Sequence, residues 1–458
     1  MENYHPQNGK LGKWIRTSIT ARMFMVGLLI LILLVPLSYI KNLIQERMLR
    51  QQEVVKEINK KWGKEVLLYG PILKVPYKVY KSRTITHPVT KEFKNEVTES
   101  IKYAYFFPNE LNIQSNINPH EKERGIYKTA VYQSKIDISG SFTHPNFSEK
   151  GTKQEDILWK KARFIIQTSN LKGVNDLVSI KIEKNQYSFN SKYEKRNSPY
   201  NKEIHLHKLE SEFLKTEYFP SKSKVSFSIT LKINGSKQIR FIPIGKETNI
   251  NINSNWKTAN FIGEYLPFNS DKITDNGFNA KWKVLDINRP FSQESFNGIP
   301  ALTKYAFGVN FMIPVDEYQK SERSVKYGFL VIALTFLIFF LIQTMSKISI
   351  HPFQYLMIGI ALTMFYTLLI SISEHSSYLR AYIIAGASVV LLISLYSKSI
   401  LKNIKFPFFI GASLTALYTF IFVIIQLENY ALLVGSIGLF IILASVMYAS
   451  RKIDWKND

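Results

Sequence analysis

The sequence predicts an integral membrane protein with six transmembrane α-helices, one near the N-terminus and five near the C-terminus, plus a large β-rich extracytoplasmic domain. Long uncharged apolar runs lie at both ends of the 458 residues, and strand-like alternation fills the middle. Lys and Arg are distributed over the short loops as expected for a multi-pass protein. The expected divisions are a basic N-terminus (1–22), a first span (23–43), a β-rich domain with a leading amphipathic helix (44–326), a five-helix domain (327–449) and a C-terminal tail (450–458).

The first span is the eighteen-residue run MFMVGLLILILLVPLSYI, at positions 23–40, which contains no charge. A hydrocarbon core about 30 Å thick needs roughly 20 residues of helix. Basic residues precede the run and no small-residue cleavage site follows it, so we expect a retained signal anchor. The other expected spans are Tyr327 to Met345, Phe353 to Ser373, Ala381 to Tyr396, Phe406 to Gln426 and Tyr430 to Ala449.

The loop charges predict that both termini are cytoplasmic, because Lys and Arg of short loops are retained on that side. This orientation puts Glu374, His375, Arg380 and Glu428 outside, together with residues 44–326. It places on the inside Lys347, Lys398, Lys402, Lys405, Arg451, Lys452 and Lys456.

The central domain carries most of the positive charge. The net charge is +24, and residues 1–43 and 327–458 contribute +4 each, which leaves +16 for residues 44–326. Beside an anionic lipid surface, each well-placed basic residue contributes on the order of 1 kcal/mol. The alternative is a general lysine bias with no partner behind it. A nucleic-acid partner is not expected for a membrane protein of this layout.

The central domain begins with a helix and continues with strands. Apolar residues from Ile44 to Trp62 recur at helical spacing, with Glu46–Arg50 and Glu57–Lys61 pairs and a stop at Gly63. Residues 73–79 alternate around Pro76, which predicts an edge strand. Further strands are expected at 101–107, 178–182 and 225–233, the last entering a hairpin at Asn234-Gly235 with 239–244. We expect antiparallel sheets, packed either as a sandwich or as two lobes, with loops at 144–156 and 191–202.

The motifs of common enzymes are missing. No phosphate-binding glycine loop, HExxH or GxSxG occurs, which disfavours an enzyme, and no cofactor is expected. The absence of cysteine excludes disulfides, thiolate zinc sites, iron–sulfur clusters and a cysteine nucleophile. His205 and His207 share a strand face where two imidazoles could ligate a metal, but no third ligand is identifiable, so solvated histidines are favoured and no metal site is predicted.

Ionisable and polar residues at span ends are the candidate contacts for a ligand or partner. Glu374 and His375 end one span, where they could relay protons or bind a headgroup amine, although a hydrated helix end is the simpler interpretation. His351, Gln354 and Tyr355 begin the same span at its other end, where interfacial anchoring is favoured.

Nine stretches spread over nearly the whole chain, in a fixed order, carry a family resemblance. They are LLVPLSYIKNLIQERMLRQQEVVKEINKKWG, GPILKVPY, RGIYKTAVY, GKETNININSNWKTANFIGEYLP, NGFNAKW, FGVNFMIPVDEYQKSERSVKYGFL, IHPFQYLMIGIALTMFYTLLISISEH, LENYALLVGSIGLF and MYASRKIDW. Through them the chain resembles the bacterial CreD proteins, also called cell envelope integrity proteins. Two departures are Gln343, where an acidic residue is expected, and the 199–210 region, which lacks a glycine-containing pattern.

The resemblance implies a Gram-negative inner-membrane location, maintenance of envelope integrity and a response to envelope stress, commonly under two-component control. It implies no catalytic residues. The leading hypothesis is therefore a non-enzymatic envelope factor whose outer domain contacts anionic lipid, peptidoglycan or envelope proteins. The alternative is a transporter or lipid-handling protein that uses the C-terminal helices, and a third class is a cell-wall hydrolase with carboxylates assembled only in space.

Overall fold

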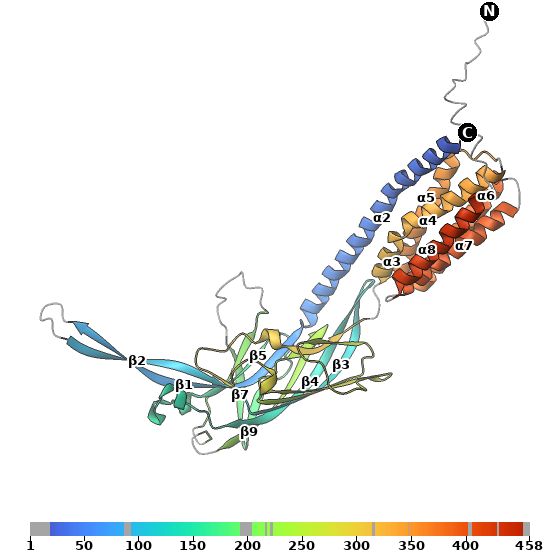
Figure 1. Cartoon of the computed structure of the whole chain (residues 1–458). Helices are drawn as coiled ribbons and strands as arrows, with labels where there is room; N and C mark the ends of the chain where they lie inside the picture. Colours follow the sequence, from blue (N-terminus) through green and yellow to red (C-terminus); the bar gives the residue numbers. More distant parts are fainter. Residues whose placement is uncertain are drawn as a thin grey trace, which may run out of the picture. The chain divides into compact units, whose positions relative to one another are not determined.

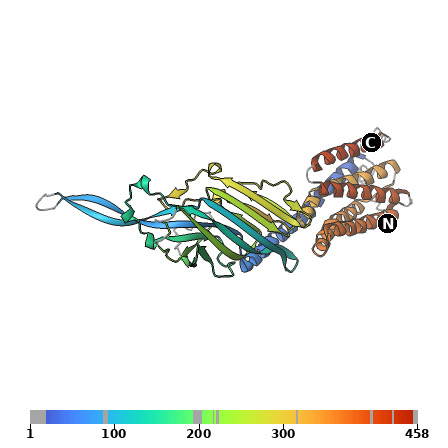
Figure 2. The same cartoon turned by 90° about the horizontal axis from the view of Figure 1, so that it is seen from below.

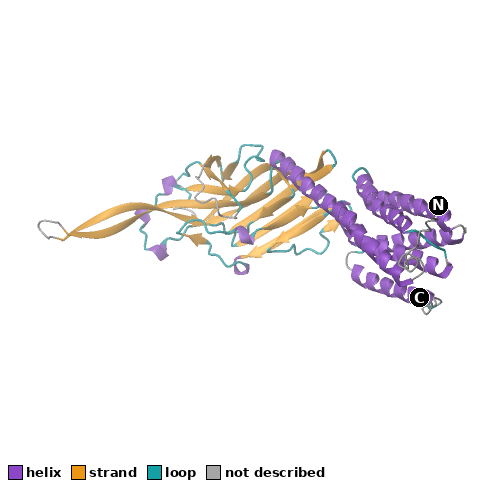
Figure 3. Cartoon of the chain, turned by 90° about the horizontal axis from the view of Figure 1, so that it is seen from above, coloured by secondary structure: helices purple, strands orange, loops and turns teal. Residues whose placement is uncertain are grey.

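The structure is a computed structural model that describes residues 19–86, 93–192, 204–215, 218–219, 223–313, 317–346, 348–401, 405–427 and 430–451. The chain forms two compact units, one of Met1–Gln52 with Val315–Asp458 and the other Glu53–Pro314. Helices build the first unit, and strands build most of the second (Figure 3).

Six helices in the described residues are long and apolar enough to cross a membrane, as the sequence predicts. Continuous helices satisfy their own backbone hydrogen bonds, which lipid cannot do for them. The helices are α2 (Ile19–Trp62), α4 (Gly328–Ser346), α5 (Pro352–Ser373), α6 (Tyr378–Leu401), α7 (Lys405–Gln426) and α8 (Ala431–Ser450). The shortest expected span becomes the 24-residue α6, because the helix continues into polar sequence at both ends of the apolar run.

A seventh helix, α3 (Glu317–Lys326), was not predicted. Its buried residues Tyr318, Ser321, Ser324 and Val325 form one face at a spacing of three to four residues. Two of them are serines, so a search for apolar runs does not detect this helix.

Small residues allow close helix packing in the first unit. A Cβ atom at Gly359 of α5 would lie 2.1 Å from Leu33 of α2, and one at Gly438 of α8 would lie 2.1 Å from the Phe420 ring of α7. Helices α4 and α5 are each half buried, whereas none of the described residues of α8 is buried. Helix α8 therefore touches its neighbours over a small area.

The second unit contains sixteen described strands. They are β1 (Val66–Thr86), β2 (Phe93–Phe106), β3 (Glu110–Arg124), β4 (Tyr127–Thr143), β5 (Arg163–Thr168), β6 (Ser179–Ile182), β7 (Asn185–Lys192), β8 (His207–Ser211), β9 (Lys224–Ser236), β10 (Gln238–Phe241), β11 (Glu247–Ser254), β12 (Ala259–Gly263), β13 (Ile273–Thr274), β14 (Gly277–Leu285), β15 (Glu294–Ser295) and β16 (Phe307–Phe311).

These strands form one continuous sheet that folds over into a sandwich. The main order is β12-β16-β10-β1-β5-β8-β7-β6-β9-β4-β3-β11-β14-β13, and β2 branches from it by pairing with β1 and β15. Strand β7 joins the two layers by pairing with β8 at one end and β6 at the other. Aromatic pairs cross between the layers, with Phe142 and Phe164 ring centroids 5.3 Å apart and those of Tyr132 and Phe311 5.1 Å apart. Of the two arrangements left open by the sequence, the sandwich is therefore the one observed.

Two expectations about strand pairing are wrong. The pairs β1–β10 and β3–β11 are parallel, so the sheet is mixed rather than antiparallel. The predicted hairpin at Asn234-Gly235 does not form, because β9 runs straight through this dipeptide. Gly235 is instead needed for packing, since a Cβ atom there would lie 2.3 Å from the buried Tyr132 ring. The chain changes layer one residue after β9, at Lys237, where φ is +61°.

Strand β1 behaves as an edge strand around Pro76, as predicted. It pairs with β5 only as far as Lys74, and beyond this point its regular partner is β2. Figures 1 and 2 show that β1 and β2 extend past the sandwich as a twisted two-stranded ribbon. The described loops include the expected one at 144–156, while 193–202 of the other lies outside the described residues.

The last part of α2 packs on its own β-rich unit, as expected for its amphipathic stripe. Thr129 Oγ1 donates to Asn59 Oδ1 at 3.2 Å, and Trp62 Nε1 donates to the Tyr132 carbonyl at 3.4 Å. Lys61 pairs with Glu57 at 3.0 Å, and the helix ends at Trp62, directly before Gly63, where φ is +153°.

Candidate functional site

The five predicted contact residues lie in two separate places. His351, Gln354 and Tyr355 are at the start of α5, and Glu374 and His375 follow its end. A helix of 22 residues is about 33 Å long, so the two groups cannot act on one ligand atom.

At the start of α5, two of these residues close the helix end. The Phe353 N–H donates to His351 Nδ1 at 3.2 Å, and the His351 N–H donates to Gln354 Oε1 at 2.9 Å. This reciprocal pair satisfies N–H groups that have no partner inside the helix. The geometry gives His351 and Gln354 a structural role.

Tyr355 is fully buried and connects α5 to α4. Its hydroxyl donates to Gln343 Oε1 at 2.8 Å, and the rings of Phe336 and Phe339 contact its ring. Gln343 is the position where the family resemblance leads us to expect an acidic residue. In this chain the neutral amide oxygen of Gln343 accepts the hydrogen bond from the Tyr355 hydroxyl, so no charge is placed inside the helix bundle.

The end of α5 is the better candidate site, because three helices meet at Glu374. Arg47 of α2 places Nε 3.6 Å from Glu374 Oε1, and the Tyr318 hydroxyl of α3 donates to the same oxygen at 3.1 Å. The Glu374 side chain is 14% exposed. This partly shielded carboxylate therefore joins the helix that enters the β-rich unit to the helix that follows it.

Helix α3 also holds the start of α6. Glu317 Oε2 accepts the Tyr378 N–H at 3.0 Å, and the Ser324 and Tyr378 hydroxyls lie 2.6 Å apart. The Lys320 ammonium lies 5.5 Å from the Tyr378 ring centroid. We call Arg47, Glu317, Tyr318, Glu374 and Tyr378 the junction cluster. Of these five residues, the sequence predicts only Glu374 as a candidate contact residue.

His375 does not join this cluster. Its backbone N–H donates to the Ile372 carbonyl, its side chain is exposed, and within the described part of the chain no hydrogen bond links it to the Glu374 carboxylate. The proton-relay hypothesis therefore gains no geometric support. Glu428 lies outside the described residues.

His205 and His207 lie side by side, with ring centroids 4.7 Å apart. Burial, and then the neighbouring His205, lower the pKa of His207. Within the described residues no group of three or more His, Cys, Asp or Glu side chains could hold a metal ion.

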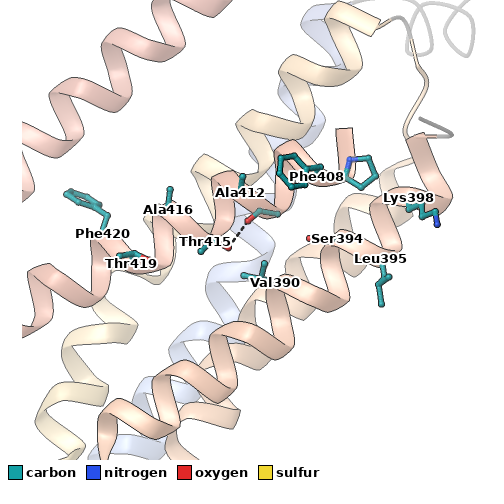
Figure 4. A pocket seen from close by; sticks show the side chains of 12 residues that line it. Val390, Ser394, Leu395, Lys398, Phe408, Ala412, Thr415, Ala416, Thr419 and Phe420 are labelled. Atoms are coloured by element: carbon teal, nitrogen blue, oxygen red, sulfur yellow. Dashed lines mark hydrogen bonds between the residues drawn. The ribbon is translucent and has the colours of Figure 1, made fainter. Parts of the chain in front are cut away.

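Two grooves flank α7 within the helical unit. One, between α6 and α7, has a volume of about 1050 Å³ and is lined by Ser394, Lys398 and Thr415 among others (Figure 4). The other has a volume of about 1030 Å³ and lies between α4, α7 and α8, with Lys405 among its lining residues. We call the second one the α8 groove.

Comparisons with known proteins agree with this architecture. The family model described as "Inner membrane protein CreD" matches residues 18–456. The chain is 26% identical over 430 residues to the inner membrane protein CreD of Escherichia coli (strain K12), covering 93% of this chain and 91% of the relative. With its six membrane-spanning helices, the chain therefore belongs to the CreD family of multi-pass inner membrane proteins.

Proposed function

We propose that this chain is a non-enzymatic inner-membrane factor that maintains cell envelope integrity and acts in the envelope stress response. The β-rich unit lies on the periplasmic side in this proposal, both termini are cytoplasmic, and the unit contacts anionic lipid, peptidoglycan or an envelope protein. The family resemblance supports the envelope role, and the +16 charge of residues 44–326 supports an anionic partner.

One observation carries the proposal of a partner. On the β1–β2 ribbon, four large side chains are exposed, namely Tyr80 (50%), Val97 (61%), Ile101 (47%) and Tyr103 (44%). The strand register pairs Val97 with Ser82, Ile101 with Lys78 and Tyr103 with Pro76, so all four project from one face. We call these four residues the ribbon face.

Next to the sandwich, the other face of the ribbon is covered by its own unit. Val75, Tyr77 and Ala104 are buried there, and the Tyr77 ring contacts Phe147 and Phe296. The four side chains of the ribbon face form an exposed apolar strip that the Lys78–Glu99 ion pair, at 3.0 Å, interrupts. Exposed apolar surface rimmed by polar groups is a common mark of an interaction surface. Lys81 and Lys102, on the opposite face of the ribbon, add positive charge.

Deletion of the gene tests the envelope role. We expect the deleted strain to be more sensitive to detergents and envelope-targeting antibiotics, and the wild-type gene to restore resistance. A Val97→Ser/Ile101→Ser double variant should restore it poorly because it removes the apolar strip, whereas Thr98→Ala, exposed on the same strand, should restore it fully. Unchanged permeability and morphology in the deleted strain would refute the role.

A second candidate function is transport or lipid handling by the C-terminal helices. The observation in its favour is the shielded Glu374 carboxylate, together with two grooves of lipid-binding size in the same unit. A Glu374→Gln variant that complements the deletion fully, combined with the absence of co-purifying lipid, would count against this candidate.

A further inference from the structure

We infer that the α8 groove is a specific binding site for one anionic phospholipid, with its acyl chains along α4 and α8 and its headgroup at Lys405. The inference deepens the lipid-handling candidate. It rests on the size, the length and the one-sided polarity of the groove.

The groove is large enough for a lipid and almost entirely apolar along its length. Its volume of about 1030 Å³ lies at the upper end of the roughly 300–1,000 Å³ typical of ligand pockets. Its apolar lining includes Leu337, Ile338 and Leu341 from α4 and Ile441 and Ile442 from α8. Helix α8 contributes to this lining although none of its described residues is buried.

The groove is shorter than a full membrane crossing. On α4 its lining runs from Leu334 to Ser346, on α8 from Gly438 to Ala449 and on α7 from Lys405 to Phe420. At 1.5 Å per residue these stretches span about 18, 17 and 22 Å, against about 15 Å for half of the hydrocarbon core and about 30 Å for all of it. This is the depth of the acyl chains of one leaflet together with the headgroup end at Lys405.

The charge of the groove lies at one end, because Lys405 is the only charged residue among its described lining residues, while Ser413 and Ser445 add hydroxyls further along. Ser346 ends α4, Lys405 begins α7 and Ala449 is next to the end of α8, so all three belong to the same membrane edge. The other end, at Leu334, Phe420 and Gly438, is apolar. In the proposed orientation the polar end faces the cytoplasm, where the leaflet surface carries anionic lipids.

Charge also distinguishes a lipid from a second copy of the chain. A second copy docked on this face would bring its own Lys405 and Arg451 to the same membrane edge, and like charges repel. An anionic phosphate headgroup is complementary to Lys405. At the end of the groove away from Lys405, Gly438 packs closely against the Phe420 ring.

Lipid retained by the purified full-length protein tests the site. The wild type, washed in mild detergent, should retain a stoichiometric amount of anionic phospholipid, measured by mass spectrometry. Ser445→Phe should displace it because Ser445 lines the groove, whereas Ser436→Phe, on the same helix outside the lining, should not. Equal retention by both phenylalanine variants would overturn the inference.

Lys405→Gln tests headgroup recognition without filling the groove. We expect the preference for anionic over zwitterionic lipid to fall about fivefold, and Arg451→Gln, at the same membrane edge but outside the lining, to leave it unchanged. Retained lipid that is indifferent to charge would overturn the site, as would a lipid-free wild-type dimer that Ser445→Phe dissociates. These measurements use purified protein. A gene deletion without an envelope phenotype would therefore refute the proposed envelope role and leave the lipid-binding results unaffected.

Discussion

Glu210 and Arg289 are charged side chains buried within the described part of the β-rich unit, and they are stabilised in different ways. Glu210 accepts from Lys74 Nζ at 3.1 Å and from Arg163 Nη1 at 2.8 Å. Arg289 donates to the carbonyls of Ile244 and Gly245 at 3.3 and 3.1 Å. Both groups tie chain segments together, since a buried charge without partners would be costly.

The first prediction concerns Glu210. Burial raises the pKa of its carboxyl, but Lys74 and Arg163 more than offset this, so the pKa is lowered from 4.5. We expect Glu210→Gln to destabilise the β-rich unit by about 2 kcal/mol at neutral pH, because two partly shielded cations lose their counter-charge. Tryptophan fluorescence during chemical unfolding reports this, since Trp159, Trp256 and Trp282 lie in the unit.

The same pair predicts a pH dependence. A carboxyl with a lowered folded-state pKa contributes its full stability above the unfolded-state pKa and loses it as the pH falls through the folded-state value. The difference between wild type and Glu210→Gln should therefore be constant above about pH 4.5 and shrink below it. A difference that does not change on acidification would contradict the ion-pair assignment.

At the scale of elements, the short helix α3 is important because it contacts both the end of α5 and the start of α6. It is short and polar, yet Glu317 closes the start of α6 and Tyr318 contacts the Glu374 carboxylate. An acceptor at the beginning of a helix satisfies free N–H groups and interacts favourably with the helix dipole. The helix therefore holds α5 and α6 together where the β-rich segment returns to the membrane.

The second prediction concerns this closure. Glu317→Gln should destabilise the helical unit by about 1 kcal/mol, because the charge at the α6 start is lost. Glu322→Gln is the matched control, since Glu322 pairs with Lys326 within α3 at 3.6 Å. Thermal unfolding of the full-length protein in detergent, followed by circular dichroism, measures both. Equal melting temperatures for the two variants would show that Glu317 does not stabilise α6.

At the scale of the whole molecule, topology decides which partners each unit meets. Six apolar helices place both ends of the described chain in the membrane, and the strands lie between the first and the second of them. The number of spans in the described residues is even, so we expect both termini on one side of the membrane, and the loop charges predict the cytoplasmic side.

The third prediction uses the absence of cysteine from the chain. A single Ser148→Cys in an exposed turn of the β-rich unit should react with a membrane-impermeant maleimide in intact spheroplasts. Ser399→Cys near the end of α6 should react only after lysis, because the proposed orientation puts this end of α6 on the cytoplasmic side. The reverse pattern would invert the proposed orientation and with it the choice of leaflet at the α8 groove.

The sequence by itself determined the number of spans, the position of the β-rich unit and five of its sixteen described strands. Apolar runs and period-two alternation are local properties of the sequence. The length and polarity of a segment decide whether it lies in lipid or folds in water. It also determined the family, because its stretches match along the whole chain.

Only the tertiary structure decided which residues far apart in the sequence are in contact. The Asn234-Gly235 pair is a strong local turn signal, but Gly235 serves the distant Tyr132 ring. Arg47, Tyr318 and Glu374 come from three helices, and residues of α4, α7 and α8 line the α8 groove. Such contacts depend on packing between segments far apart in sequence, and no local pattern encodes which segments become neighbours.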